Sequence, residues 1–544
     1  MRPVNLADAG FLMMEKRQTP MHVGGLHLFN YPKGVDQRKF LQEILTALRT
    51  EEEYRRPFGE YVTTGRAGPL RLYWETDDHF DIDYHVRHSA LPQPGRYREL
   101  FMLVSRLHST LLDRTRPLWE THLIEGLQNN QFALYSKVHH AATDGASAMH
   151  MMNAMYSTSA RTRARHSALS HEAYERYKSQ RLPPAAGRIE PRGRELKNVL
   201  EALRQQYDTT TSLMSAFRQF GGAFFGRSGN LAVPWHQVPR TSINTNVTGS
   251  RRFVAQSFDF ERVRGVCKAT DATVNDVVLA MCAGALRRHL SSQNERPPHS
   301  LKAMAPVSLR DDNDLDSSNA IGFITADLAT DVADPEQRLR KIQASMAAGK
   351  DLLRSMSQRE ATLFMQITQV PALLSSVLGL AGHFPAFSTV ISNVPGPREQ
   401  LYWNGASLEG VYPASIVFDG FAMNITLVSY RKQLDFGIVA CRRSMPQVQR
   451  IIDYLEEALG ELEELAGLRT APRRKPSAKT KPAAATKPKA KAKPKPKPKP
   501  KPKPKPKAKA KAKAGKATTG RQAARTQPPR ASKPKLAGTA TAKG

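Results

Sequence analysis

The chain of 544 residues has only three cysteines, Cys267, Cys282 and Cys441, and they lie far apart in the sequence. Paired cysteines, which a disulfide framework, a zinc ribbon or a CxxC redox site requires, are therefore not indicated. So few cysteines also fit a protein of the reducing cytoplasm. No GxSxG sequence occurs, which argues against a serine hydrolase of the α/β type.

Long uninterrupted apolar runs are also missing. No apolar segment typical of a secretory signal follows residues 1–8, so we expect a cytoplasmic protein. The least charged stretch, 361–397, contains no Asp, Glu, Lys or Arg. Its apolar part, 362–384, includes two glutamines, a proline and paired serines, which argue against a membrane-spanning helix. Two alternatives stay open here, a buried helix or a helix that lies in a lipid interface.

The C-terminal segment 471–544 lacks every acidic and aromatic residue, yet it holds 26 of the 81 Lys and Arg residues. It supplies most of the net charge of +32, so that the preceding 470 residues are nearly balanced. Lys and Pro alternate over 493–507, which prevents a helix or a sheet ladder and favours an extended polyproline II chain. Repulsion between like charges predicts that this tail is disordered.

Three classes of partner fit such a tail: the anionic phospholipid of a membrane or lipid-droplet surface, nucleic acid, or another polyanion. An anionic membrane attracts each nearby lysine with roughly 1 kcal/mol. Without aromatic residues the tail cannot stack on single-stranded bases, so any binding to nucleic acid would be nonspecific contact with phosphates. A purely solubilising tail is the remaining alternative.

The part of the chain before the tail exceeds one usual hydrophobic core, so we expect two domains of mixed α/β structure. Strand patterns occupy 21–29, 132–138 and 253–260, and a hairpin is expected over 427–440. The clearest helix covers 448–462, and Ser444 with Gln447 predicts a capping box before it. The predicted divisions are an N-terminal domain 1–156, a helical crossover 157–240, a C-terminal domain 241–468 and the tail 469–544.

One short string carries most of the chemical information: His139-His140-Ala141-Ala142-Thr143-Asp144-Gly145. It follows a predicted strand and precedes an Ala- and Met-rich stretch, 141–156, that is typical of a turn opening a helix. Because histidine accepts a proton near neutral pH, a base here can deprotonate a hydroxyl group as it attacks a thioester. The string lacks the His-x3-His spacing of a zinc-binding helix, so we predict no metal and no cofactor.

The string resembles the HHxxxDG motif of CoA-dependent acyltransferases with the chloramphenicol-acetyltransferase-like fold and of the related condensation domains. Further motifs extend the resemblance over the first 465 residues, in the order found in bacterial wax ester synthase/diacylglycerol acyltransferases. These motifs are PMHVGG at 20–25, FDIDYHVR at 80–87, RPLWE at 116–120, LIEGL at 123–127, TVNDVV at 273–278 and SNVPGP at 392–397. The tail is the one departure from the family pattern.

The resemblance implies an acyl-CoA-dependent O-acyltransferase with two chloramphenicol-acetyltransferase-like domains and an active site in a tunnel at their interface. His140 would be the general base that takes a proton from a fatty alcohol or diacylglycerol and returns it to the CoA thiolate. Such assistance is worth about 10²–10⁴ in rate. His139 would help to position the substrates or have a purely structural role.

Other motif residues receive roles from the same resemblance. Asp144 would brace the loop by pairing with an arginine, or would orient the histidine directly. Gly145 would permit a tight turn or close packing. Asn275, expected near a helix start, would stabilise the oxyanion, unless it is a helix cap or makes an interdomain hydrogen bond. The residues expected to be structural are Pro117, Leu118, Trp119, Asp276, Asn393, Pro395 and Gly396.

We therefore expect a neutral-lipid synthase that works at the inner membrane face or on lipid droplets. Its substrates would be acyl-CoA with diacylglycerol, a long-chain fatty alcohol or both, and its products triacylglycerol and wax esters. The alternative is a non-catalytic tether of lipid bodies or of the nucleoid that retains the fold.

Overall fold

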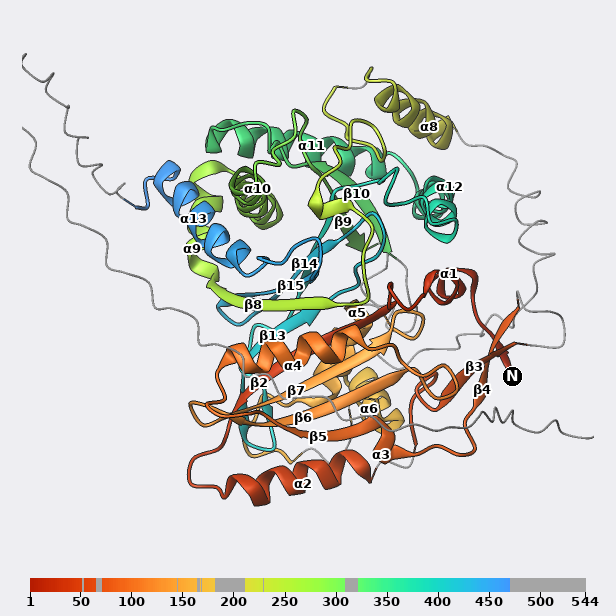
Figure 1. The fold of residues 1–544 in the computed structure, drawn as a ribbon, viewed down its shortest axis with the longest axis vertical. Coiled ribbons are helices and arrows are strands. Elements are labelled where there is room, and N and C mark those ends of the chain that lie inside the picture. The colour runs from red at the N-terminus through yellow and green to blue at the C-terminus, as the bar shows by residue number, and fades with distance from the viewer. Residues whose placement is uncertain are drawn as a thin grey trace, which may run out of the picture. The chain divides into compact units, whose positions relative to one another are not determined.

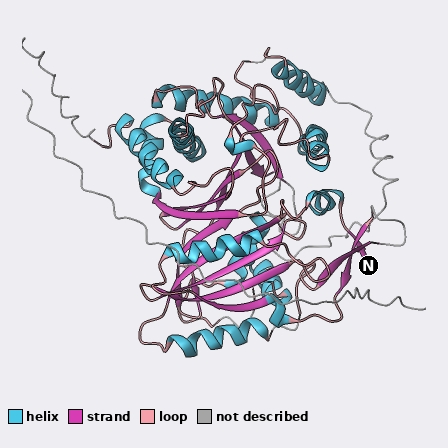
Figure 2. Ribbon diagram, viewed as in Figure 1, coloured by secondary structure: helices cyan, strands magenta, loops and turns pink. Residues whose placement is uncertain are grey.

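Two six-stranded sheets form the framework of the protein (Figures 1 and 2). The computed structural model describes residues 1–50, 53–64, 71–143, 145–163, 167, 169–181, 211–227, 229–308 and 321–469. The described residues belong to one unit that spans residues 1–474. Asp144, residues 182–210 of the predicted crossover and all but the first residue of the predicted tail lie outside the described residues.

The first sheet is built mostly from the N-terminal half of the chain, and its strand order is β12-β13-β2-β7-β6-β5. Its strands are β12 Tyr402–Trp403, β13 Ala406–Ala414, β2 His22–Asn30, β7 Gln131–His139, β6 Trp119–Leu127 and β5 Val86–Ala90. Two amphipathic helices, α2 (Gln37–Arg49) and α4 (Tyr97–Ser109), belong to this half.

The second sheet comes entirely from the C-terminal half, in the order β10-β9-β11-β14-β15-β8. Its strands are β10 Ile321–Asp327, β9 Lys302–Ser308, β11 Thr389–Pro395, β14 Met423–Tyr430, β15 Gln433–Cys441 and β8 Arg251–Asp259. Its helices are α9 Phe260–Thr270, α10 Val274–Ser292, α11 Pro335–Arg354 and α13 Arg450–Leu465. A largely aliphatic core joins these helices to the sheet.

The two halves exchange elements. Strand β13 follows β11 in the chain but pairs antiparallel with β2 of the first sheet, with Val411 opposite His27. In return, α4 of the first half packs against β8 of the second, where Ser105 Oγ accepts a hydrogen bond from the Phe253 amide at 2.8 Å. Residues that we expected in the C-terminal domain thus extend the N-terminal sheet, and the domain boundaries stay a prediction.

Smaller elements complete the described fold. A three-stranded sheet has the order β1-β4-β3, with β1 Arg2–Pro3, β4 Leu72–Thr76 and β3 Glu60–Thr64. The remaining helices are α1 Leu6–Met14, α3 Ile82–His85, α5 Gly145–Met155, α6 His171–Arg181, α8 Thr211–Phe224, η1 Ser242–Asn244 and α12 Gln358–Val377. None of the described helices combines the length and apolarity needed to cross a bilayer.

The predicted strands and hairpin are confirmed, and so is the helix that follows the double histidine. The predicted capping box of the last helix is wrong, because α13 begins only at Arg450 and its N-cap, Gln449, makes no side-chain capping bond. Turns separate Ser444 from the helix. The apolar stretch 362–384 forms most of α12 and is only half buried, since one face packs inward and the other is exposed.

Candidate active site

Strand β7 carries the double histidine to its junction with the turn before α5. His139 ends the strand and is completely buried, whereas His140 is partly exposed. The His139 amide donates to the Leu118 carbonyl at 2.9 Å, and the His140 amide donates to the Met21 carbonyl at 2.8 Å. Segments next to the two neighbouring strands thus fix the backbone of both histidines.

The ring of His139 is held by contacts on both nitrogens. Its Nδ1 accepts a hydrogen bond from the Ala141 amide at 3.1 Å, so the ring proton of the neutral form lies on Nε2. Nε2 faces the Glu15 carboxylate, 3.5 Å from Oε1. His139 therefore has one tautomer and one orientation, both set by the protein.

Glu15 follows α1 and is buried beside the motif. Its carboxylate also accepts from the Met21 amide at 3.2 Å and pairs with Arg114 at 3.0 Å. Burial alone would raise its pKa, but the close approach of His139 outweighs that effect, with further contributions from the Met21 amide and Arg114. The pKa is consequently lowered, and the side chain is an anion at neutral pH.

His140 lies against α1. Its ring stacks on Phe11, with ring centroids 4.1 Å apart and planes 12° from parallel. Leu12 of the same helix packs with Ala141 and Leu118 in a small apolar cluster. Helix α1 and the residue that follows it, Glu15, therefore contact both histidines and the turn after them.

The motifs of the two halves meet at α5. The Cα of Gly145 faces β11, where a Cβ would lie 3.5 Å from Val394 Cγ2, an ordinary van der Waals contact. Its backbone is not in the left-handed region, so the described geometry gives no steric reason for glycine there. Asn393, the neighbour of Val394, donates from Nδ2 to Asn275 Oδ1 at 2.7 Å.

Helix α10 begins next to that hydrogen bond. Thr273 is its N-cap and forms a capping box with Asp276, whose Oδ2 accepts from the Thr273 amide and hydroxyl at 2.9 and 2.7 Å. Asn275 is therefore not the helix cap, and its bond to Asn393 lies within the C-terminal half rather than between halves. Its side chain is exposed in the first turn, where amide groups of a helix have no partner in the helix.

The Pro395-Gly396 segment closes the end of β11. A Cβ on Gly396 would lie 2.4 Å from the Ser429 carbonyl oxygen and 2.8 Å from Val428 Cγ1, so only glycine allows this approach to β14. The Gly396 amide donates to Ser429 Oγ at 3.2 Å.

The Pro117-Leu118-Trp119 segment leads into β6. Trp119 is 2% exposed, and its indole donates from Nε1 to the Phe58 carbonyl at 2.8 Å. Its ring also stacks on His85, with centroids 4.5 Å apart. The structure thus places Trp119 in the core, and Leu118 is buried in the cluster beneath the histidines.

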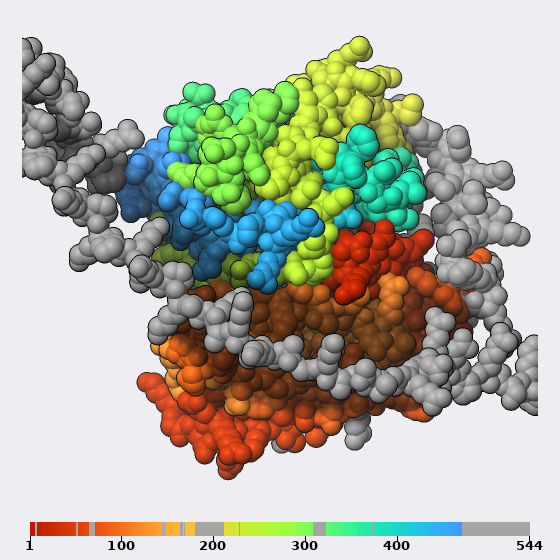
Figure 3. All heavy atoms as spheres, viewed as in Figure 1, coloured from red at the N-terminus to blue at the C-terminus, as the bar shows by residue number. Residues whose placement is uncertain are grey.

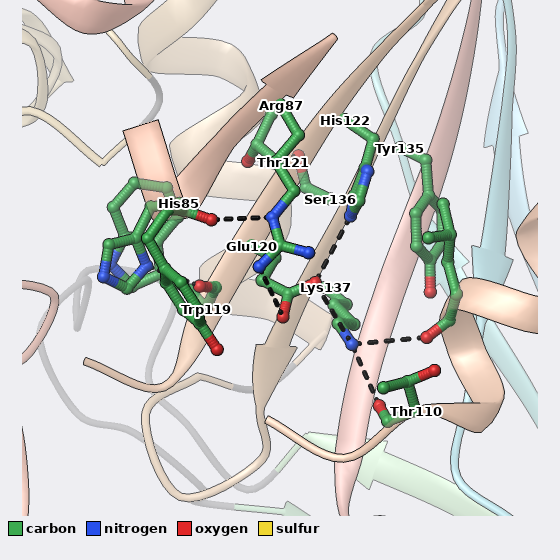
Figure 4. Close-up of polar contacts among 12 residues, drawn as sticks. His85, Arg87, Thr110, Trp119, Glu120, Thr121, His122, Tyr135, Ser136 and Lys137 are labelled. Atoms are coloured by element: carbon green, nitrogen blue, oxygen red, sulfur yellow. Dashed lines mark hydrogen bonds and ion pairs between the residues drawn. The ribbon is translucent and has the colours of Figure 1, made fainter. Parts of the chain in front are cut away.

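A buried ionic cluster lies along β6 and β7 (Figure 4). Glu120 pairs with Lys137 and His122, both at 3.3 Å, and with Arg87 at 3.6 Å. Burial alone would raise the pKa of Glu120, but the His122 hydrogen bond and the charges of Lys137 and Arg87 lower it overall. Lys137 Nζ also donates to the carbonyls of Leu107 and Thr110 at the end of α4, which matches the negative end of the helix dipole.

Two cavities lie elsewhere in the C-terminal half. One of about 130 Å³ is lined by polar residues that include His299, Lys302 and Asp327, and one of about 30 Å³ is lined by apolar residues of α8, α11 and α12. Neither borders the double histidine, and the interfacial tunnel stays a prediction. In the described part of the chain, no three His, Cys, Asp or Glu side chains are grouped to hold a metal ion.

Three residues at this site were not predicted from the sequence: Phe11, Glu15 and Arg114. Glu15 and His139 are far apart in the chain, and no recognisable spacing connects them. Only the folded position of α1 shows their role.

Comparisons with known proteins cover both halves of the chain. The family model described as the wax ester synthase/diacylglycerol acyltransferase catalytic domain matches residues 4–278, and the model of the C-terminal domain of the same family matches residues 317–463. The O-acyltransferase WSD of Acinetobacter baylyi is 41% identical over 466 residues, which cover 84% of this chain and 96% of the relative.

Solved structures give the same result. The wax ester synthase/diacylglycerol acyltransferase from Marinobacter aquaeolei VT8 matches with a TM-score of 0.67 and 41% identity, over 86% of this chain and 100% of that one. The first condensation domain of the CDA synthetase matches in fold alone, with a TM-score of 0.51 and 16% identity, over 85% of this chain and 95% of that one. The predicted fold class is confirmed.

Proposed function

The chain belongs to the wax ester synthase/diacylglycerol acyltransferase family, and on that basis we propose how it transfers an acyl group from acyl-CoA to a lipid alcohol. The acceptor is the free hydroxyl of diacylglycerol, a long-chain fatty alcohol or both. The products are triacylglycerol and wax esters. The relatives are named as acyltransferases, which gives no support to a non-catalytic tether.

His140 acts as the general base. It takes the proton of the acceptor hydroxyl while the oxygen attacks the thioester carbonyl carbon. The tetrahedral intermediate then collapses, the carbon–sulfur bond breaks, and His140 returns the proton to the CoA thiolate. No other group needs to gain or lose a proton over the full reaction, and no cofactor takes part.

One observation carries the choice between the two histidines. Both nitrogens of the completely buried His139 face protein groups, the Ala141 amide and the Glu15 carboxylate. His140, in contrast, is partly exposed, and its ring stacks on Phe11 of α1. His139 and Glu15 therefore position the turn, while His140 meets the substrate.

The second half supplies the oxyanion site. Because Asn275 Oδ1 accepts from Asn393, its Nδ2 group is the one that can donate to a developing oxyanion. The adjacent N-terminus of α10 favours negative charge at the same place. Gly145, the first residue of α5, faces Val394 of β11.

The protein binds peripherally to the inner membrane face or to lipid droplets, where its water-insoluble acceptors are found. The basic tail contributes electrostatic attraction to anionic lipid.

An acceptor panel tests this function. The full chain is incubated with palmitoyl-CoA and hexadecanol, dipalmitoylglycerol or no acceptor, and both free CoA and ester are measured. We expect ester in a 1:1 ratio with CoA, and CoA release that depends on an acceptor. Equal CoA release without an acceptor would indicate a thioesterase, and no ester with either acceptor would refute the proposal.

A further inference from the structure

Helix α12 presents two apolar stripes on different faces. The inner stripe contains Ala361, Phe364 and Met365, which are buried against α8, where Phe364 contacts Phe217 and Phe220. The outer stripe is spaced by three and four residues, the helical repeat, and continues into the turn after the helix. Its exposed members include Ile367, Val370, Leu374, Leu378, Leu380 and Phe384.

This outer stripe is the main exposed apolar surface of the described chain. Leu378 and Phe384 are 69% and 67% exposed, and Phe225, which follows α8, is 74% exposed. The described chain has sixteen exposed large apolar side chains. Eleven of them lie on α1, α8 or α12, or in the residues that directly follow α8 and α12. Helix α12 contacts both α1 and α8, which are far from it in the sequence, and the three helices lie along the same side of the protein in Figures 1 and 3. Contiguous apolar surface of this kind marks an interaction site.

The charge around the stripe is positive. Residues 211–240 and 361–397 contain no Asp or Glu. Lys16 Nζ bonds to the carbonyl of Val377 at 3.4 Å, which places a cation at the C-terminal end of α12. Arg17, Arg218 and Arg227 are exposed on the flanking segments. An apolar face with a cationic border matches the boundary between acyl chains and anionic headgroups.

Helix α1 connects this surface to the double histidine. It contacts α12 on one side, and on the other its Phe11 stacks on His140. Contacts within the protein therefore run from the apolar face of α12 through α1 to His140.

We propose that the exposed face of α12 and its following turn, flanked by α8 and α1, docks on an anionic phospholipid membrane and admits the lipid alcohol toward His140. The inference rests on the proposed function for the identity of the alcohol. It assigns to this face the hydrophobic part of membrane binding, distinct from the electrostatic attraction of the tail.

Vesicle flotation in 1 M KCl tests the docking face. At that ionic strength the Debye length is about 3 Å, so attraction by the tail is screened while apolar burial persists. The test variant is Leu374→Ser/Leu378→Ser/Phe384→Ser in the full chain. The matched control, Val35→Ser/Met102→Ser/Leu468→Ser, removes exposed apolar side chains from other segments. The vesicles contain phosphatidylcholine with 30 mol% phosphatidylglycerol.

We expect the wild type and the control to bind equally, and the test variant to bind at least tenfold more weakly. Equal binding of all three in 1 M KCl would overturn the proposal. So would light scattering that shows a wild-type oligomer which only the test variant dissociates, because the face would then bind a second copy. If the triple variant does not fold, Leu378→Ser alone should still bind about twofold to threefold more weakly.

Release of CoA from palmitoyl-CoA with the water-soluble acceptor hexanol separates this inference from the proposed function. The test variant should match the wild type with hexanol and fall behind it with vesicle-bound dipalmitoylglycerol. If the wild type releases no CoA with either acceptor, the proposed function fails while the flotation result still decides the docking face.

Discussion

The two sheets share a six-stranded architecture but differ in the chemistry they bury. The strands of the first sheet carry five histidines, His22, His27, His88, His122 and His139, whereas the six strands of the second sheet carry none. The second sheet instead packs its helices on a continuous aliphatic core. Histidines on the strands are therefore found only in the half that holds the candidate base, and we infer that the other half acts mainly as its support.

Other histidines of the first half are not bases, however. Burial lowers the pKa of His22 well below its ordinary value, and burial lowers the pKa of His108 on α4 to about 3. His22 Nε2 faces the His108 carbonyl at 2.9 Å, and His108 Nδ1 faces the Tyr135 hydroxyl at 2.8 Å. These rings are neutral hydrogen-bonding groups that tie α4 to the sheet. Buried histidines such as His22 and His108 therefore have structural roles, whereas His140 is partly exposed.

The largest stability effect is expected in the ionic cluster of the first sheet. Lys137→Met leaves Glu120 buried without its closest cation, and removing one partner of a buried pair typically costs about 3–5 kcal/mol. Urea unfolding followed by circular dichroism measures the loss. The double variant Lys137→Met/Glu120→Gln should recover part of it. A loss below about 1 kcal/mol would show that the first sheet does not depend on its buried charges.

The second sheet contains an exception to its apolar character, the buried Asp435 of β15. It accepts from Ser257 Oγ at 2.6 Å and from the Val411 amide of β13 at 2.8 Å. Burial raises its pKa from 3.8 to about 7. Between these two values the folded protein holds a proton that the unfolded chain releases. The contribution of Asp435 to the free energy of unfolding is therefore complete below pH 3.8 and decreases until about pH 7.

Asp435→Asn should remove this pH dependence. Relative to the variant, the wild type is expected to lose stability from pH 4 to pH 7, by about 4 kcal/mol at most, and then to level off. Denaturant unfolding of both proteins at pH 4, 5.5, 7 and 8 measures the difference. Parallel curves for the two proteins would mean that Asp435 is ionised in the fold throughout this range.

A smaller effect is expected where the second sheet meets the motif. Gly396→Ala forces a Cβ against the Ser429 carbonyl and should cost about 1–3 kcal/mol. Gly145→Ala meets only an ordinary contact with Val394 and should change stability by less than about 0.5 kcal/mol. Thermal unfolding of the two variants side by side distinguishes them. Equal losses would contradict the difference in packing between the two glycines.

Local patterns predicted the elements of this site better than their contacts. The strand before His139 and the helix after Gly145 follow from alternation and composition, and both are confirmed. The contact of Glu15 with His139 depends on a helix more than a hundred residues earlier in the chain, and no local pattern encodes it. The exchange of β13 was also hidden, because alternation identifies a strand but not its partner. The capping box at Ser444 was wrong since a permitted cap sequence does not require the helix to start there.

The rate of CoA release by His140→Ala, with palmitoyl-CoA and hexadecanol, tests the central claim most directly. Removal of a general base should lower kcat by about 10²–10⁴ while the variant keeps the wild-type unfolding temperature. Asn275→Ala, on the supporting half, serves as the comparison and should lose less. Wild-type activity in a folded His140→Ala protein would contradict the assignment of the base. It would also contradict the view that the first half carries the base while the second half supports it.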